Sequence, residues 1–164
     1  MGVGKSTTAA ALAEALGYGL ADSDDDIDKL LGCSGADVAA THGVEELHRL
    51  EEAVLLGALL RDTPMVIAGA ASVVEGVVVR QALGRLAVVV RLSLDGAEVL
   101  RRQRSGTHRR PMSAGEYAVL AERREPLFVA VEDLRLDAGQ PTGQLVAAIV
   151  DHLLARRDTG RWPP

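Results

Sequence analysis

The sequence has only one cysteine and no long apolar run, and each of these features excludes some classes of protein. Cys33 has no second cysteine to pair with, which excludes an intramolecular disulfide and a cysteine-based metal site and fits a reducing compartment. No apolar stretch approaches the roughly 20 residues that a membrane-spanning helix needs. No basic segment followed by a short apolar stretch, as in a secretory signal, precedes the first motif. We therefore expect a cytoplasmic protein that does not bind membranes.

Lysine is also scarce, and the charge balance is acidic. Among the 18 basic residues only Lys5 and Lys29 are lysines, and the net charge of −5 argues against general nucleic-acid binding. Seven arginines lie between Arg101 and Arg124. Because the guanidinium group suits two-pronged contacts with carboxylates and phosphates, this stretch carries the residue type that small anionic ligands require.

The length and composition indicate one domain. The chain has 164 residues, of which 48% are apolar and 25% charged, as in ordinary globular proteins. We found no internal repeat, low-complexity segment or second domain. We expect a single domain over residues 1–157 and a disordered tail over 158–164.

The first motif stands at the very beginning of the sequence. Gly2-Val3-Gly4-Lys5-Ser6-Thr7 and the alanine-rich run after it are typical of a phosphate-binding loop that leads into a helix. In the full motif G-x-x-x-x-G-K-[ST], backbone N–H groups surround the phosphates, the lysine reaches the β- and γ-phosphates, and the hydroxyl binds Mg²⁺. The leading glycine of this motif and the strand that normally precedes it do not occur in the sequence.

Three interpretations of this half-motif compete. The tripeptide could be a chance helix cap, the chain could carry a half-built loop, or Met1 could be an internal loop residue with the strand and first glycine before it. We expect the last. A parallel sheet without its central strand would leave the backbone groups of two neighbouring strands unpaired.

Apolar runs and helical patterns alternate along the rest of the chain, which predicts an α/β fold with a parallel sheet covered on both faces. A fifth strand is expected before the phosphate loop. Runs 64–68 and 86–94 indicate strands buried on both faces, and residues 105–113 indicate a mobile loop. The predicted strands are 18–21, 64–68, 86–94 and 134–137, and the predicted helices are 6–16, 25–31, 34–41, 44–60, 77–83, 97–104, 117–124 and 144–156.

Two carboxylates follow the first predicted strand. Ligands of open α/β sheets bind beyond the carboxyl ends of the strands, where Asp22 and Asp24 fall, together with the loop Gly69-Ala70-Ala71. Facing a Lys/Ser phosphate site, one carboxylate can order a magnesium ion and another can accept a proton from an attacking hydroxyl. The alternative is that Asp22 and Asp24 only cap the next helix. Lys5 and Ser6, a short distance upstream, favour phosphoryl transfer.

At this point the chain resembles the shikimate kinases, which are small P-loop kinases similar to nucleoside-monophosphate kinases. The resemblance extends from Gly2 to about Leu154. It rests on Gly4-Lys5-Ser6-Thr7, Asp22-Ser23-Asp24 with Ile27, Arg49-Leu50-Glu51-Glu52, Val66-Ile67-Ala68-Gly69, Arg109-Arg110-Pro111 and Arg123-Arg124-Glu125-Pro126-Leu127-Phe128.

The resemblance implies a three-layer P-loop kinase fold, with substrate-binding helices at about 25–60 and a lid at about 104–116. It implies ATP as co-substrate, Mg²⁺ as cofactor, a small hydroxylated carboxylate as acceptor, and a monomer. The resemblance implies that the catalytic residues are Lys5, Asp24 and Arg110, and that the metal is bound by Ser6 and Asp22. It implies that ATP is bound by Gly2, Val3, Gly4, Lys5, Ser6, Thr7, Arg102 and Arg110. It implies that the acceptor is bound by Asp24, His48, Gly69, Ala70, Ala71 and Arg124. For Arg101, Arg102 and Arg104 a solvated helix face is the competing interpretation.

The sequence departs from the family in the acceptor half. Leu47 and His48 replace Phe-Arg, and the glycine-rich loop reads Gly69-Ala70-Ala71. A neutral imidazole offers a carboxylate fewer hydrogen-bond donors than a guanidinium and no permanent charge. The Cβ atoms of the two alanines restrict the backbone conformations of the loop. Arg49 points about 100° away from His48 around the helix and is an imperfect substitute. The remaining departures are Val44 after Gly43, and Ala39 in place of a phenylalanine.

Three functions are compatible with these observations. The first is phosphorylation of the 3-hydroxyl of shikimate by ATP, a step in aromatic amino-acid (chorismate) biosynthesis, which we favour. The second is a related kinase that acts on another cyclitol or a sugar-like acceptor. The third is a catalytically defective nucleotide-binding member.

Overall fold

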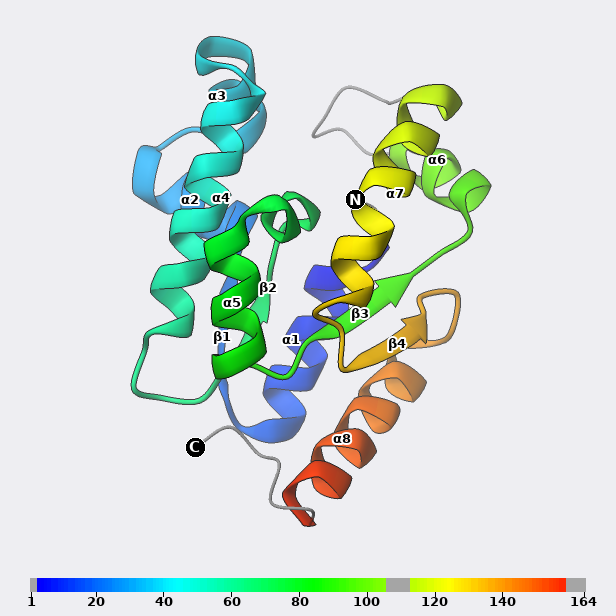
Figure 1. The fold of residues 1–164 in the computed structure, drawn as a ribbon. Helices are drawn as coiled ribbons and strands as arrows, with labels where there is room; N and C mark the ends of the chain where they lie inside the picture. Colours follow the sequence, from blue (N-terminus) through cyan, green and yellow to red (C-terminus); the bar gives the residue numbers. More distant parts are fainter. Residues whose placement is uncertain (1–2, 106–112, 159–164) are drawn as a thin grey trace.

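The computed structural model describes residues 3–105 and 113–158, and within them four strands and eight α-helices alternate as predicted (Figure 1). Most of the predicted lid and the tail from residue 159 onward lie outside the described residues; Asp158, expected in the tail, instead ends a helix. The elements are α1 (Lys5–Leu16), β1 (Gly19–Asp22), α2 (Ser23–Leu31), α3 (Gly35–His42), α4 (Val44–Leu59), β2 (Met65–Ala68), the 3₁₀-helix η1 (Ala71–Glu75), α5 (Val77–Leu86), β3 (Val90–Ser93), α6 (Gly96–Ser105), α7 (Ala114–Val129), β4 (Leu134–Asp137) and α8 (Thr142–Asp158).

Local capping explains several helix boundaries. Gly17 ends α1 with φ +66°, a conformation that glycine adopts without a Cβ clash. Ser34 begins α3 and Ser113 begins α7, each with a capping box completed by the acidic residue three positions on. Within the described ranges, no helix combines the length and the apolar character needed to cross a membrane.

The strands form two separate parallel pairs instead of one continuous sheet. β1 pairs with β2 in the register Gly19↔Met65 to Asp22↔Ala68, and β3 pairs with β4 from Val90↔Leu134 to Ser93↔Asp137. The chain leaves β2, passes through η1 and α5, and then enters β3 (Figure 1). The α/β class is confirmed, but the sheet is divided between β2 and β3 across the described residues.

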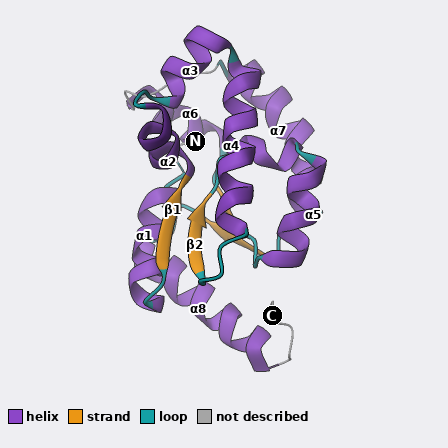
Figure 2. Ribbon diagram, turned by 90° about the vertical axis from the view of Figure 1, so that its left-hand side faces the viewer, coloured by secondary structure: helices purple, strands orange, loops and turns teal. Residues whose placement is uncertain are grey.

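Helices cover the two faces of these strands (Figures 1 and 2). On one side α1 packs against β2 and α8. On the other, α4, η1 and α5 contribute Leu55, Val73 and Val79 to a buried cluster against which Ile67 of β2 and Val89 pack. The arrangement is the three-layer organisation expected of an α/β domain.

The prediction that the second and third strands are buried on both faces is wrong for most of their residues. Only Ala68 of β2 is buried, and all four residues of β3 keep intermediate exposure. The reason is a large cavity between the two pairs of strands, which leaves one side of each strand without a packing partner.

Candidate active site

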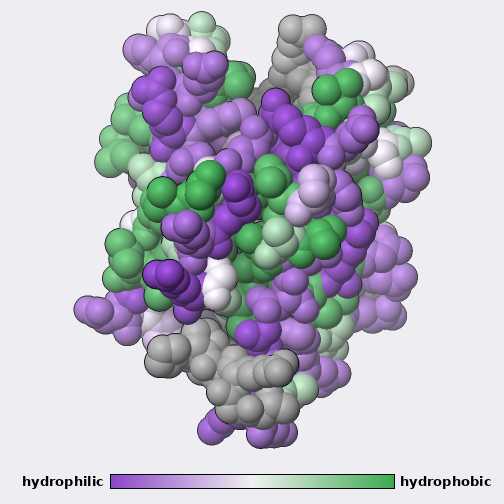
Figure 3. Space-filling model, in the orientation of Figure 1, coloured by the Kyte–Doolittle hydropathy of each residue, from purple (hydrophilic) through white to green (hydrophobic). Residues whose placement is uncertain are grey.

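A cavity of about 1620 Å³ collects most of the predicted site residues. Its wall includes residues of α1, β2, β3, η1 and α7, so segments from most of the chain meet there. In the space-filling view the surface is indented between the lobe of α2–α4 and the lobe of α6 and α7 (Figure 3). Predicted residues on the cavity wall are Val3, Lys5, Asp24, His48, Gly69, Ala70, Ala71 and Arg124.

The phosphate-loop residues adopt the geometry of a loop entering a helix. Gly4 caps α1 with φ +88°, a left-handed conformation that disfavours any residue with a Cβ, and its carbonyl accepts the N–H of Thr8 at 3.0 Å. Lys5 opens the helix, and Ser6 and Thr7 are exposed in its first turn. The free N–H groups of that turn form an anion site of the kind that binds phosphate. Gly2 lies outside the described residues.

The two aspartates after β1 have different surroundings. The Asp22 carboxylate caps α2 by accepting the backbone N–H of Asp24 at 3.1 Å, so the helix begins at Ser23, two residues earlier than predicted. Asp22 therefore caps this helix. Asp24 lies in the first turn of α2, is exposed, and faces the same cavity as Lys5.

The loop after β2 tolerates its two alanines without backbone strain. Ala70 has φ −66° and ψ 148°, and none of the described non-glycine residues has a positive φ. Ser72, the residue after the two alanines, donates its hydroxyl to the carboxylate of Glu51, which is only 1% exposed. This buried bond ties the loop to α4. Sequence reasoning missed it, although Glu51 falls four residues from both Leu47 and Leu55 on the apolar face of α4.

On α4 the structure separates His48 from Arg49. His48 lies on the cavity wall. Arg49 is 71% exposed and pairs with Glu46 of the previous turn at 2.8 Å, so it does not reach the cavity. Arg49 therefore cannot take the place of a basic side chain at position 48.

Arg124 reaches the cavity from α7 but already has a carboxylate partner. Its Nε lies 2.5 Å from Oε1 of Glu75, and an Nη of Arg123 lies 2.8 Å from the same oxygen. Partial burial would by itself raise the pKa of Glu75, but the hydrogen bonds from Arg124 and Arg123 outweigh it and hold that pKa below its ordinary value. Glu75 was not among the predicted site residues, and its pairing depends on a contact 49 residues apart.

Arg102, which is predicted near the nucleotide, binds a carboxylate of its own helix. Its Nε is 2.7 Å from Oε1 of Glu98, one turn earlier on α6, and Arg101 pairs with the same carboxylate. These bonds lower the pKa of Glu98 to about 2. Arg101, which is 72% exposed, fits the solvated helix face, whereas Arg102 is half-buried and does not line the cavity. Arg110 and the side chain of Arg104 lie outside the described residues.

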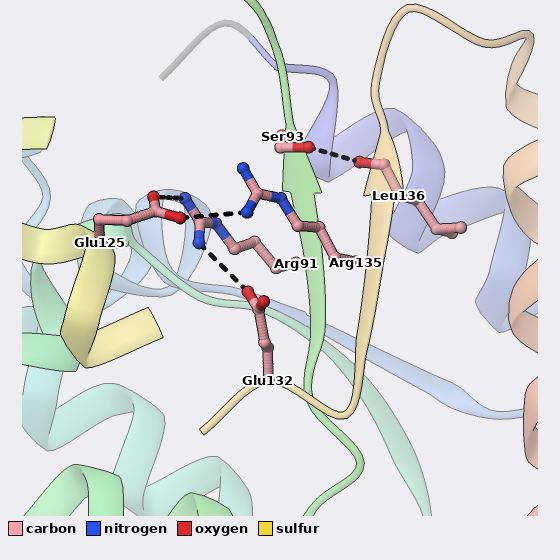
Figure 4. A network of polar contacts seen from close by, with 6 residues as sticks. All are labelled: Arg91, Ser93, Glu125, Glu132, Arg135 and Leu136. Carbon is pink, nitrogen blue, oxygen red and sulfur yellow. Dashed lines mark hydrogen bonds and ion pairs between the residues drawn. The ribbon is translucent and has the colours of Figure 1, made fainter. Parts of the chain in front are cut away.

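A second polar network holds α7 against the strands. Arg91 of β3 is 13% exposed, pairs with Glu125 of α7, and donates to Glu132 at 3.2 Å (Figure 4). Arg135 of β4 reaches the other oxygen of Glu125 at 3.1 Å, and the Arg91 guanidinium lies 4.5 Å from the centre of the Phe128 ring. Since Glu125 directly follows Arg124, this network also fixes the segment of α7 that carries the predicted acceptor-binding arginine.

A lysine and two hydroxyls at a helix N-terminus, beside the carboxyl ends of parallel strands and facing an aspartate, define the class of P-loop phosphotransferases.

Comparison with known proteins is more specific. The family model described as shikimate kinase matches residues 1–154. The shikimate kinase of Mycobacterium tuberculosis (strain ATCC 25177 / H37Ra) is 38% identical over 161 residues, covering 94% of this chain and 88% of that protein. That of Mycobacterium leprae (strain TN) is 34% identical over 160 residues, with coverages of 94% and 77%.

Solved structures agree in fold. Shikimate kinase from Acinetobacter baumannii, in complex with shikimate, superposes with a TM-score of 0.83 at 24% identity, covering 95% of this chain and 89% of that one. The enzyme from Aquifex aeolicus gives a TM-score of 0.81 at 20% identity, with coverages of 96% and 94%. The chain belongs to the shikimate kinase family.

Proposed function

We propose that the protein is a kinase that transfers the γ-phosphoryl group of ATP to the 3-hydroxyl of shikimate, giving shikimate 3-phosphate and ADP in chorismate biosynthesis. The observation that carries this proposal is the convergence of Lys5, Asp24 and Arg124 on one cavity, although they come from three helices. Membership of the shikimate kinase family supports the choice of acceptor.

The nucleotide side of the proposed site is the N-terminus of α1. Its backbone N–H groups would bind the phosphates from Val3 to Thr7, and Lys5 would place its ammonium group beside the β- and γ-phosphates. In phosphoryl transfer most of the rate enhancement comes from fixed positive charge around the transferring group. Arg110, which lies outside the described residues, is proposed to add a second charge.

The donor groups near Lys5 suit magnesium. The hydroxyl of Ser6 and the carboxylate of Asp22 are oxygen ligands of the kind Mg²⁺ prefers, and both lie at the edge where the phosphate loop and β1 end. When bound there with ATP, the ion would neutralise charge on the phosphates. Lys5 and the helix N-terminus would then orient the nucleotide, and Asp22 would keep its capping bond to Asp24.

The acceptor side uses Asp24 and Arg124. Asp24 would hydrogen-bond the acceptor hydroxyls and take the proton from the attacking oxygen, since its carboxylate faces the cavity that Lys5 lines. Arg124 would bind the acceptor carboxylate through its guanidinium group. The backbone of Gly69, Ala70 and Ala71 and the imidazole of His48 would complete this wall.

The test is ADP release by the purified protein with ATP, Mg²⁺ and shikimate, each left out in turn. Turnover that requires all three, and that falls at least about 100-fold in Asp24→Asn, is expected because general base catalysis typically contributes 10²–10⁴-fold. A matched control is Asp28→Asn, in the same helix and absent from the cavity wall. ATP hydrolysis that shikimate does not stimulate would contradict the proposal.

We also propose that the protein acts as a monomer in the cytoplasm. The site is built from a single chain, and its co-substrate is ATP. Light scattering across a tenfold concentration range should give one mass near 17.3 kDa. A mass that increases with concentration would contradict the monomer.

A further inference from the structure

The ion pair between Glu75 and Arg124 places an internal carboxylate on the arginine that is proposed to bind the acceptor. Nε of Arg124 lies 2.5 Å from Oε1 of Glu75, and the two side chains are 12% and 27% exposed. Across the ranges that the structure describes, no other carboxylate lies within ion-pair distance of Arg124. The charge of this guanidinium is therefore largely balanced before any ligand enters the cavity.

Arg123 is the second partner of Glu75. One of its Nη atoms lies 2.8 Å from the same oxygen, and its side chain is 57% exposed. Because solvent screens the pair with Arg123 more strongly, Arg124 is the partner that interacts more strongly with Glu75. Partial burial alone would raise the pKa of Glu75, but the bonds from both arginines lower it, so this carboxylate is ionised near neutral pH.

The backbone that carries Glu75 is held independently of Arg124. The half-buried guanidinium of Arg80, on α5, donates to the carbonyl of Val74 and, at 3.0 Å, to that of Glu75. These bonds fix the end of η1, from which the Glu75 side chain extends toward α7. The carboxylate is thus expected to stay beside Arg124 when a ligand approaches.

The cavity lies on one side of this ion pair. Arg124 lines the cavity, and so do residues 71–74 of η1, whereas Glu75 does not. A ligand in the cavity would therefore meet the guanidinium of Arg124 while Glu75 binds the same group from outside the wall. This arrangement lets Glu75 influence a bound acceptor through Arg124 without contacting it.

We infer that Glu75 is a specificity-determining residue that weakens the binding of carboxylate-bearing acceptors relative to uncharged acceptors of the same shape. The inference rests on the proposed function, in which Arg124 binds the acceptor carboxylate. A second carboxylate would have to share Arg124 with Glu75, and a guanidinium that is already paired gains less from it than an unpaired one. An acceptor without a carboxylate avoids this competition.

Glutamine at position 75 separates the charge of this residue from its hydrogen bond. The amide oxygen of glutamine can accept the bond from Nε of Arg124, as the carboxylate does, but it carries no charge. Glu75→Gln should therefore keep the guanidinium in place and free its charge for the acceptor.

The test measures KM and kcat for shikimate and for its methyl ester, with the unmodified protein and with Glu75→Gln. The substitution should lower KM for shikimate about tenfold and leave KM for the ester and both kcat values within about twofold. A purely structural role of Glu75 would instead change the kinetics of both acceptors together. Equal shifts of KM for the acid and the ester would thus overturn the inference, as would an unchanged KM for shikimate.

The matched control is Glu122→Gln, which removes the same charge from an exposed position of α7. It should leave both KM values within about twofold, because screening by solvent weakens the effect of an exposed charge. If it lowered KM for shikimate as much as Glu75→Gln does, the effect would follow from net charge alone, and the specific role of Glu75 would be overturned.

A double substitution tests whether Glu75 acts through Arg124. In a protein that already carries Arg124→Gln, adding Glu75→Gln should change kcat/KM for shikimate by less than about twofold, since the shared guanidinium is gone. A tenfold gain that persists in this background would show that Glu75 repels the acceptor directly. That result would overturn the proposed route through Arg124.

The inference and the proposed function fail in different ways. If shikimate neither binds to nor is turned over by any of these proteins, the proposed function is wrong, and the role of Glu75 toward a carboxylate acceptor is wrong with it. If shikimate is turned over but the ratio of the two KM values is unchanged in Glu75→Gln, only the inference about Glu75 is overturned.

Discussion

At the scale of single residues, the walls of the cavity are held by charged and polar side chains that bind each other before any ligand arrives. Glu51 accepts from Ser72, Glu75 binds Arg124, and Asp22 accepts from the backbone of Asp24. Such bonds hold these side chains in one conformation. Polar groups that are already oriented need little reorganisation when charge develops in the transition state. A substitution at one partner is therefore expected to change both stability and acceptor binding.

The bond between Ser72 and Glu51 gives a stability prediction. Ser72→Ala leaves a carboxylate that is 1% exposed with one donor fewer, so unfolding in urea should require about 1–3 kcal/mol less free energy. Thr41→Ala is the control, because the Thr41 hydroxyl donates to the carbonyl of Asp37 at an exposed position. Similar losses in the two variants would show that burial does not determine the effect.

His48 gives a prediction about acceptor affinity. His48→Arg places a permanent positive charge on the cavity wall, and KM for shikimate should fall about tenfold, the equivalent of a charge-assisted bond of about 1.5 kcal/mol. Steady-state kinetics with shikimate as the varied substrate measures this. Arg49→Gln should leave KM unchanged, since that side chain binds Glu46 in solvent. An unchanged KM in His48→Arg would mean that position 48 does not contact the acceptor.

At the scale of elements, α7 is the helix whose placement decides whether Arg124 faces the cavity. It begins at a capping box at Ser113 and docks on β3 and β4 through Arg91 and Arg135 (Figure 4). Partial burial opposes ionisation of Arg91, but its bonds to Glu125 and Glu132 prevail, and the pKa of Arg91 is raised. The helix is thus fastened to the strands by charge as well as by the Phe128 ring.

Removing the central guanidinium should loosen this helix. Arg91→Leu leaves Glu125 and the largely buried Glu132 without it, and the free energy of unfolding should fall by about 1–3 kcal/mol after allowance for the exposure of Glu125. Arg135→Leu removes an exposed partner of the same glutamate and should cost less than about 1 kcal/mol. Urea titrations followed by circular dichroism compare them. Equal losses would contradict a central role of Arg91.

At the scale of the whole molecule, periodicity and capping residues predicted the order of elements, because helix signals such as Gly17 and Ser34 act locally. The predicted strand at 134–137 agrees with β4, whereas the run 86–94 was too long, since only Val90–Ser93 pair with a neighbour. The Glu75–Arg124 pair and the Arg91 network could not be predicted. The bonds of Arg124 to Glu75 and of Arg91 to Glu125 join residues 49 and 34 positions apart, and no local pattern records such contacts.

The ion pairs of the whole molecule predict how stability depends on pH. The pKa of Glu75 and that of Glu125 lie below the ordinary 4.5 in the folded protein, and the pKa of Glu98 falls to about 2. Groups with a lowered folded pKa stabilise fully above their unfolded value and lose that contribution as pH falls through the folded one. The urea midpoint should thus decline between pH 4.5 and about pH 2.

A triple variant separates this effect from general acid unfolding. With Glu75, Glu98 and Glu125 all replaced by glutamine, the three lowered pKa values are removed, and the midpoint should start lower at pH 6 and decline less steeply in acid. Raised salt should reduce the difference between the two proteins mainly through Glu98, whose partner Arg101 is 72% exposed. Parallel curves for the two proteins would show that other carboxylates determine the acid limit.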